Sequence, residues 1–591
     1  MPITAITTSN SIRVNAFVRS PPVEETGNEH RWTTKWRRMC RVVFDGCGRS
    51  GRAHCKLLAA GRRSTAGCDC SHRMLGGWPQ RPSQASLRFH EGESLEAPGR
   101  GAPTEILTGC GKKGGIRSYR FSGMLFNSNT FLAFFAAFLL LYWLVRNNRS
   151  ARNQLLVAAS SLFYGWWDWR FLGLLLFTAS VDFWVGLRLS SCDEPFRRRR
   201  WLCLSLAANL GVLGLFKYFG FFSDSFRYVL GLFGIGSPSW SWSVVLPLGI
   251  SFYTFQALSY TVDVYRRQIP ATRDPIGFLA FILFFPQLVA GPIERASRLL
   301  PQFHEARVID PAAIESGWWL ILWGMFKKVA LADNLAPLAD LAFSEPFPGR
   351  SAGVVLLGTA AFAGQIYGDF SGYSDIARGL ARWLGFELCV NFREPWLATN
   401  VREYWQHWHV SLSSWFRDYL YIPLGGDRRG AVRTAWNLGI TMTLAGLWHG
   451  ASWHFVLWGA WHGLGLIGYR LWISRRPKRR SIPTWPSVGL TWAVTTLFVG
   501  YGWLLFRAVS MEQVLSMTFS LTNWNNPRWL PGYAWQVVVY LAPLGFSQWI
   551  WRHLDRTAVP LWARAAVQAL LLTGILLGWS RTPAPFIYFQ F

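Results

Sequence analysis

The sequence predicts an all-α polytopic membrane protein, and three observations support this fold class. Hydrophobic residues make up 51% of the 591 residues and charged residues only 16%, whereas about a quarter of a soluble protein is charged. The 35 tryptophans and 43 phenylalanines also favour a membrane protein, because aromatic side chains gather where hydrocarbon meets headgroups. Apolar segments follow one another from residue 124 onward with little soluble sequence between them. We therefore expect about 10–12 transmembrane helices, with re-entrant and interfacial helices among them.

The first 123 residues differ from the rest of the chain. They contain no apolar run long enough to cross a bilayer and no signal-peptide pattern. Their content of Gly, Arg, Ser and Pro predicts disorder. Our hypothesis is that translation starts at Met124, so that residues 1–123 are a mis-assigned extension and residues 124–591 form one membrane domain. The alternative is a disordered basic cytosolic tail, and N-terminal sequencing of the native protein distinguishes the two.

Cysteines are distributed unevenly between these two parts. The hydrophobic part holds only Cys192, Cys203 and Cys389 of the 9 cysteines, which argues against a disulfide framework there. In the first part, Cys68 and Cys70 form a Cys-x-Cys pair without a second pair at zinc-finger spacing. We therefore predict no metal site.

The formal net charge of +28 does not indicate nucleic acid binding. Basic residues form short clusters between apolar runs, and no basic face is interleaved with stacking aromatic residues. The strongest clusters are RRRR at 197–200 and RRPKRR at 475–480. The positive-inside tendency places both in the cytoplasm, next to the headgroups of the lipid bilayer.

The apolar segments after Met124 define the expected helices. They span residues 128–145, 153–167, 170–188, 201–221, 227–236, 244–262, 276–291, 314–332, 353–367, 372–388, 434–448, 453–473, 487–507, 536–551 and 561–579. Gly and Pro interrupt the segments between residues 270 and 450. Broken helices at membrane depth need protein or a water-filled cavity to satisfy the freed backbone, so we expect a cavity in this region. We find no internal repeat, which argues against a transporter built from paired halves.

A Gly-spaced segment at residues 364–386, GQIYGDFSGYSDIARGLARWLGF, places polar groups within apolar sequence. They are Asp369, Ser371, Tyr373, Ser374, Asp375 and Arg378. Ionisable groups at membrane depth are costly and usually face a partner or a water-filled path. Asp375 and Arg378 are three residues apart and would pair on a helix, so a structural ion pair is the simpler interpretation.

The next polar stretch predicts an amphipathic helix over residues 401–420. Such a helix would place along one face the residues Arg402, Trp405, His409, Leu412 and Phe416, with Trp408 and Trp415 on a neighbouring stripe. A helix lying in the membrane interface explains the tryptophans and arginines. It does not explain His409, because an imidazole among apolar side chains needs a partner.

Three further histidines follow within apolar sequence. His449 and His454 lie in GLWHGASWHF at 446–455, and His462 lies in LWGAWHG. Periodicity does not choose among the three. An intramembrane histidine is more often a packing residue than a catalyst, but two histidine-bearing segments beside broken helices raise the case for a catalytic imidazole.

The residues resemble a known family at this point. REYWQHWHVSLSSWFRDYLYIPLGG, followed by LWHGASWHFVLWGAWHG, resembles the paired histidine motifs of membrane-bound O-acyltransferases, and in particular their alginate O-acetyltransferase branch. Supporting stretches are MLFNSNTFLAFF, SLFYGWWDWRFL, LPLGISFYTFQALSYTVDVYR, FFPQLVAGPIERA and LWGMFKKVALADNLA. The resemblance covers residues 124–591 in order and none of residues 1–123.

The resemblance implies a fold and assigns site residues. Many helices would surround a central tunnel in which a cytosolic acyl donor meets an acceptor from the other side. His449 matches the near-invariant histidine of the family and His409 the second one, whereas His454 and His462 do not hold those places. We expect Trp405 and Trp408 to shape the substrate-binding site.

The chemistry fits these residue types. Acyl transfer from a thioester to a hydroxyl requires removal of the hydroxyl proton, which a neutral imidazole performs at physiological pH. Burial disfavours the charged imidazolium, so an apolar site keeps His449 ready to act as general base. His409 would then orient the donor or the acceptor. The sequence identifies no oxyanion stabiliser, and no Gly-x-Ser-x-Gly elbow indicates a serine nucleophile.

We therefore predict an acyltransferase of groups other than aminoacyl groups. It would sit as a multi-pass protein in the bacterial plasma (inner) membrane and acetylate an extracellular polysaccharide such as alginate or a related glycan. By resemblance, the donor is acetyl-CoA or another acetyl carrier, no cofactor is bound, and a periplasmic or surface-exposed transferase is a partner. The alternatives are O-acylation of peptidoglycan, teichoic acid, lipid or protein hydroxyls, or a transporter or export scaffold that would tolerate loss of His449.

Overall fold

A computed structural model describes residues 124–235, 245–344, 350–475, 484–553, 559–579 and 586–587. Within these ranges every regular element is helical. Residues 1–123, with the proposed extension and the Cys68–Cys70 pair, lie outside them, as does most of the basic cluster at 475–480.

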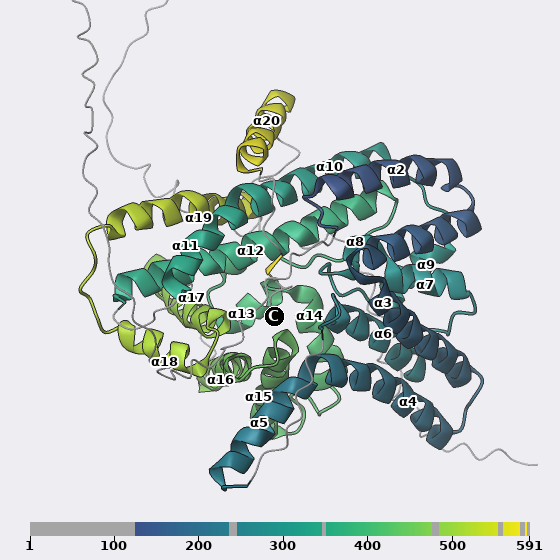
Figure 1. Cartoon of the computed structure of the whole chain (residues 1–591), viewed down its shortest axis with the longest axis horizontal. Coiled ribbons are helices and arrows are strands. Elements are labelled where there is room, and N and C mark those ends of the chain that lie inside the picture. Colours follow the sequence, from purple (N-terminus) through teal and green to yellow (C-terminus); the bar gives the residue numbers. More distant parts are fainter. Residues whose placement is uncertain are drawn as a thin grey trace, which may run out of the picture. The chain divides into compact units, whose positions relative to one another are not determined.

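The helices follow one another along the chain with short connections (Figure 1). The first half contains α2 (Asn129–Val145), α3 (Arg149–Ser190), α4 (Pro195–Leu213), η2 (Gly214–Tyr218), α5 (Phe219–Leu232), α6 (Ile250–Tyr265), α7 (Pro275–Leu283), α8 (Phe285–Leu288), α9 (Ala296–His304), α10 (Pro311–Met325), η3 (Phe326–Ala332) and α11 (Asp333–Phe343). The second half contains α12 (Ala352–Trp383), η4 (Pro395–Leu397), α13 (Val401–His407), α14 (Val410–Phe416), η5 (Arg417–Tyr421), α15 (Gly430–His449), α16 (Trp453–Arg475), α17 (Trp485–Arg507), α18 (Met511–Ser520), α19 (Leu530–His553) and α20 (Leu561–Gly578). η2, η3 and η5 are π-helical turns, and η4 is a 3-10 turn.

The helical class predicted from the sequence is confirmed, and the apolar segments fall on helices. By length and composition, four helical runs among the described residues are apolar enough to cross a membrane: α3, the run Pro195–Leu232, α17 and α20. The described helices α12, α15, α16 and α19 are also 20 residues or longer. The expected number of crossings stays a prediction.

Helix α12 corrects one expectation. We predicted two segments, 353–367 and 372–388, separated by a Gly-rich interruption, but α12 is a single helix of 32 residues. The glycines of α12 do not interrupt the helix; Gly372 and Gly379 lie where its backbone contacts the backbone of α10. A Cβ on Gly372 would lie 2.8 Å from the Gly324 oxygen of α10, and a Cβ on Gly379 would lie 2.5 Å from the Gly317 oxygen. Small residues let two helix backbones touch, which is how helices pack where water supplies no hydrophobic driving force.

Close approach at glycines also joins α15 and α16, which pack as an antiparallel pair. A Cβ on Gly446 would lie 2.2 Å from the Phe455 oxygen, and a Cβ on Gly459 would lie 2.3 Å from the Met442 oxygen. The backbone approach at these glycines therefore sets the position of the C-terminal end of α15, where His449 lies.

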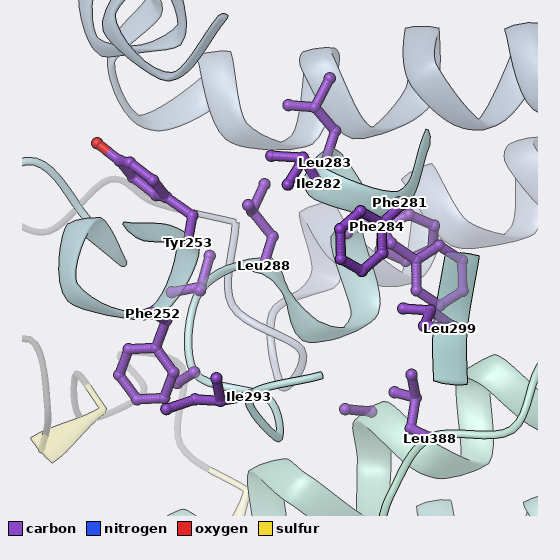
Figure 2. Packing of buried hydrophobic residues seen from close by; sticks show 14 of the residues in the cluster. Phe252, Tyr253, Phe281, Ile282, Leu283, Phe284, Leu288, Ile293, Leu299 and Leu388 are labelled. Atoms are coloured by element: carbon purple, nitrogen blue, oxygen red, sulfur yellow. The ribbon is translucent and has the colours of Figure 1, made fainter. Parts of the chain in front are cut away.

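Large apolar side chains from distant segments form the core next to this pair. Figure 2 shows part of one cluster, in which α6 contributes Phe252, α7 contributes Phe281, α9 contributes Leu299 and the segment after α12 contributes Leu388. A second cluster contains Trp408, Trp458 and Phe506.

We predict that Gly459→Ala destabilises the protein. The added methyl group overlaps the backbone of α15, and such overpacking costs about 1–3 kcal/mol. Gly468→Ala in the same helix is the matched control, because an added Cβ there meets no atom within 4 Å. Heating of the two detergent-solubilised variants should give a lower unfolding midpoint for Gly459→Ala only. Equal midpoints would contradict the close contact of α15 with α16.

Candidate active site

The backbone breaks at His409, where a continuous helix over 401–420 was expected. α13 ends at His407, Trp408 is extended, and His409 has a φ of 43° in the left-handed region before α14 begins. The expectation of one continuous helix was therefore wrong. The apolar residues keep a helical spacing on both sides of the break, so periodicity alone does not detect it. A left-handed non-glycine residue costs about 1–3 kcal/mol and persists only where its surroundings hold it.

Asn391 and its neighbours hold this break. The Val410 N–H donates to the Asn391 carbonyl at 2.9 Å, and the Arg393 N–H donates to the His407 carbonyl at 3.0 Å. The backbone groups released by the broken helix thus pair with the segment at 391–393, as buried backbone groups must.

The Asn391 side chain also orients the imidazole of His409. Its Oδ1 lies 2.9 Å from His409 Nδ1 and 2.8 Å from the Ser411 hydroxyl, while its Nδ2 donates to Ser374 at 3.1 Å. Because an amide oxygen only accepts, Nδ1 of His409 carries the donated proton. A neutral His409 then presents the lone pair of Nε2, which is buried without a hydrogen-bond partner among the described residues.

His449 reaches the same place from the end of another helix. It is the last residue of α15, its side chain is buried, and Gly450 continues in an extended conformation. Its ring packs edge-on against Trp458 and Phe506, with centroid distances of 5.0 and 5.2 Å. These two rings belong to the second core cluster.

The two imidazoles lie close together and pack against residues of both core clusters. Their ring centroids lie 6.4 Å apart. The ring of Phe370, from the first cluster, packs edge-on against His409 at 4.6 Å. Two neutral nitrogen bases are thus held side by side away from bulk water. This arrangement can accept a proton and orient a hydroxyl group beside it.

Comparison of the sequence with known proteins identifies the family of the chain. The family model described as MBOAT, membrane-bound O-acyltransferase family, matches residues 238–495. The chain is 39% identical over 501 residues to the probable alginate O-acetylase AlgI of Pseudomonas putida, covering 79% of this chain and all of the relative. The chain belongs to the membrane-bound O-acyltransferase family.

Two other relatives also have names that describe O-acetylation enzymes. The probable alginate O-acetylase AlgI of Pseudomonas aeruginosa is 42% identical over 408 residues, covering 68% of this chain and 76% of the relative. The peptidoglycan O-acetyltransferase of Helicobacter pylori is 33% identical over 434 residues, covering 68% and 80%. Membership of the membrane-bound O-acyltransferase family makes the chain an acyltransferase. The transporter and scaffold alternatives are therefore set aside.

The structure separates the two tryptophans expected at the substrate site of this O-acyltransferase. Trp405 is half-buried and packs against Trp458 at 5.7 Å and His462 at 5.2 Å, so it lies one ring away from His449. Trp408 is fully buried and packs against Trp503 at 4.8 Å. Trp408 also packs against Phe392, whose ring lies 6.3 Å from that of His409. Contact of either tryptophan with substrate stays a prediction.

The other two histidines occupy different surroundings. Nδ1 of His454 donates to the Leu505 carbonyl at 3.2 Å, which gives this side chain a structural partner. His462 is buried and packs against Trp458, which also contacts His449, at a centroid distance of 4.9 Å. Sequence reasoning set His462 aside, yet it lines the same aromatic cluster as His449.

The charges of α12 are engaged in ion pairs. Arg378 lies 3.8 Å from Asp375, as its spacing predicted, but Lys327 of η3 is the nearer partner of Asp375 at 2.6 Å. Lys328 pairs with Asp369 at 2.7 Å. These contacts favour a structural role for the polar segment 364–386. Among the described residues, no group of three or more His, Cys, Asp or Glu side chains is arranged to hold a metal ion.

Sequence reasoning missed three contributors to the site. Asn391 lies in a loop where no periodicity singles it out, and Trp458 is one of many tryptophans. Lys217, whose Nζ donates to the His449 carbonyl at 3.1 Å, left a clearer signal, because it is the sole charged residue between Arg200 and Asp224. A lone charge in an apolar span usually has a functional or structural partner.

We predict that Asn391→Leu lowers acyl transfer at least about tenfold, whereas Asn391→Asp keeps more activity. Leucine removes the acceptor of the His409 proton and leaves a buried donor unpaired, at a cost of about 1–3 kcal/mol. Activity is measured per folded molecule in membranes. Asn437→Leu is the control, because Asn437 is another buried asparagine, bonded to the Gly426 carbonyl at 2.9 Å. Equal rates per folded molecule for the two leucine variants would contradict a special role for Asn391.

Proposed function

We propose that this acyltransferase transfers an acetyl group from a cytosolic thioester to hydroxyl groups of an extracellular polysaccharide, such as alginate or a related glycan. The observation that carries the proposal is the meeting of His409 and His449 in one buried site. The names of the Pseudomonas relatives support acetyl as the acyl group and a polysaccharide as the acceptor.

His449 acts as general base in this mechanism. Its imidazole takes the proton of the acceptor hydroxyl while the hydroxyl oxygen attacks the thioester carbonyl. The tetrahedral intermediate then collapses, the carbon–sulfur bond breaks, and the imidazolium returns its proton to the departing thiolate. Such proton transfers contribute about 10²–10⁴-fold to a rate.

His409 orients the reacting groups. Because its Nδ1 donates to Asn391, Nε2 of the neutral ring can only accept a hydrogen bond. This nitrogen therefore binds a hydroxyl of the acceptor and turns it toward His449. Trp405 bounds the same space through its packing against Trp458, and Trp408 is the second proposed shaping residue.

The donor and the location complete the proposal. Acetyl-CoA or another acetyl carrier supplies the thioester from the cytosol, and the protein resides in the bacterial inner membrane. A separate periplasmic or surface-exposed transferase is the proposed partner that completes delivery to the polymer. Peptidoglycan is the second candidate acceptor, because the Helicobacter pylori relative carries that name. Separate acetate determinations on purified peptidoglycan and on exopolysaccharide distinguish the two acceptors.

We predict that His449→Ala abolishes acetylation. In a deletion strain complemented with the variant, ester-linked acetate on extracellular polymers should fall to the level of the deletion strain, because the base is missing. His409→Ala should lower it strongly. His454→Ala is the matched control from the same motif and should keep acetylation, because the hydrogen-bond partner of His454 is the backbone carbonyl of Leu505.

Immunoblots of the membrane fraction show whether each variant is inserted. Wild-type acetate levels with His449→Ala would remove the proposed base. Loss of acetate with all three variants would indicate that the histidines matter for folding instead of chemistry.

A further inference from the structure

A lysine lies in the middle of an apolar helical run. Lys217 belongs to η2, a π-helical turn between α4 and α5, and the run Pro195–Leu232 is one of the candidate membrane spans. A π-helical turn is uncommon and is often found at functional sites. A charged side chain at such depth is costly and requires partners.

The partners of Lys217 are at the end of the helix that carries His449. Its Nζ donates to the Trp448 carbonyl at 2.6 Å and to the His449 carbonyl at 3.1 Å. It also donates to the Ser251 hydroxyl of α6 at 3.2 Å. The adjacent Tyr218 hydroxyl donates to the Leu447 carbonyl at 3.0 Å. One π-helical turn thus supplies donors to three successive carbonyls at the end of α15.

These carbonyls need donors from elsewhere. The last carbonyls of an α-helix have no partner within the helix, and α15 ends at His449, where the chain turns into an extended Gly450. The carbonyl end of a helix also carries a partial negative charge, which a cation stabilises. Among the described residues, no carboxylate lies within ion-pairing distance of Lys217. The helix end is therefore its electrostatic partner.

We propose that Lys217, assisted by Tyr218, is a positioning residue that fixes His449 for catalysis. Lys217 binds the backbone carbonyl of His449, the residue whose imidazole is the proposed base. Rotation of the last turn of α15 would therefore move this ring away from His409. Ends of helices fray readily, and a misplacement of about 1 Å can cost 10²-fold in rate. This inference rests on the proposed role of His449 as the base.

The test compares Lys217→Met, Lys217→Arg and Tyr218→Phe with Arg227→Met. Methionine fills similar space without donors, arginine keeps charge and donors, and phenylalanine removes only the hydrogen bond to Leu447. Arg227 is the control cation from the same helical run, and its ion-pair partner is Asp224 within α5. Inverted membrane vesicles receive radiolabelled acetyl-CoA, and alkali-labile label in non-dialysable material gives kcat and the KM for acetyl-CoA per folded molecule.

A positioning role predicts a specific pattern. Lys217→Met should lower kcat at least about tenfold and leave KM within about twofold, because the donor site is intact while the base is misplaced. Lys217→Arg should recover at least half of the lost kcat on a logarithmic scale. Tyr218→Phe should lower kcat about twofold or more, and Arg227→Met should match the wild type.

Other patterns overturn the inference. Wild-type kcat in Lys217→Met shows that the contact does not position the base, and a raised KM with unchanged kcat assigns Lys217 to donor binding. If Lys217→Met does not reach the membrane, Tyr218→Phe decides, because it removes the hydrogen bond to the Leu447 carbonyl. Wild-type kcat in Tyr218→Phe then rejects the proposal.

Different results would contradict the proposed function itself. Activity in His449→Ala removes the base whatever Lys217 does. Absence of label in wild-type vesicles removes acetyl-CoA as the donor, and the same Lys217 and Tyr218 variants are then compared through the ester-linked acetate of whole cells.

Discussion

The burial of broken helix ends is the constraint on which the rest of this site depends. Backbone groups released inside a membrane protein cannot turn to water and must find partners in the protein. Both histidines of the site lie at such a break. His409 separates α13 from α14, and His449 ends α15. The segments that supply the missing hydrogen bonds, around Asn391 and Lys217, also bring the two imidazoles together.

Close helix packing fixes the positions of these helix ends. Gly446 and Gly459 bring α15 and α16 into backbone contact, and Gly324 and Gly372 do the same for α10 and α12. Backbone contact leaves little freedom for one helix to slide past the other, so the ends of α15 and of its neighbours keep fixed positions. The backbone contacts fix the location of the two histidines, and bulky rings such as Trp458 pack around them.

The sequence predicts the helical class and the positions of the apolar segments, because these depend on composition and local pattern. The family motif singles out His409 and His449, which the structure brings close together, and their catalytic roles stay predictions. Prediction from the sequence fails where a long-range contact overrides a local pattern. Glycines within α12 suggested an interruption, since glycine is a poor helix former, but the facing helix makes small residues necessary there. The break at His409 was missed for the opposite reason, because its stabilising partner, Asn391, lies in a distant loop. Lys217 is visible in the sequence as a lone charge, but its partners become known only when η2 is placed against α15.

The burial of both imidazoles has a chemical consequence for acyl transfer. A thioester reacts with water as well as with a sugar hydroxyl, so an acyltransferase must keep water from its base. The exposed fraction of residue His409 is 0% and that of His449 is 4%, and aromatic rings pack against both. Rings offer no site for a competing water beside the imidazole, while the lone pair of His409 Nε2 offers one acceptor for a hydroxyl that enters the site. In the proposed mechanism, this aromatic packing would therefore favour transfer to a hydroxyl group over hydrolysis.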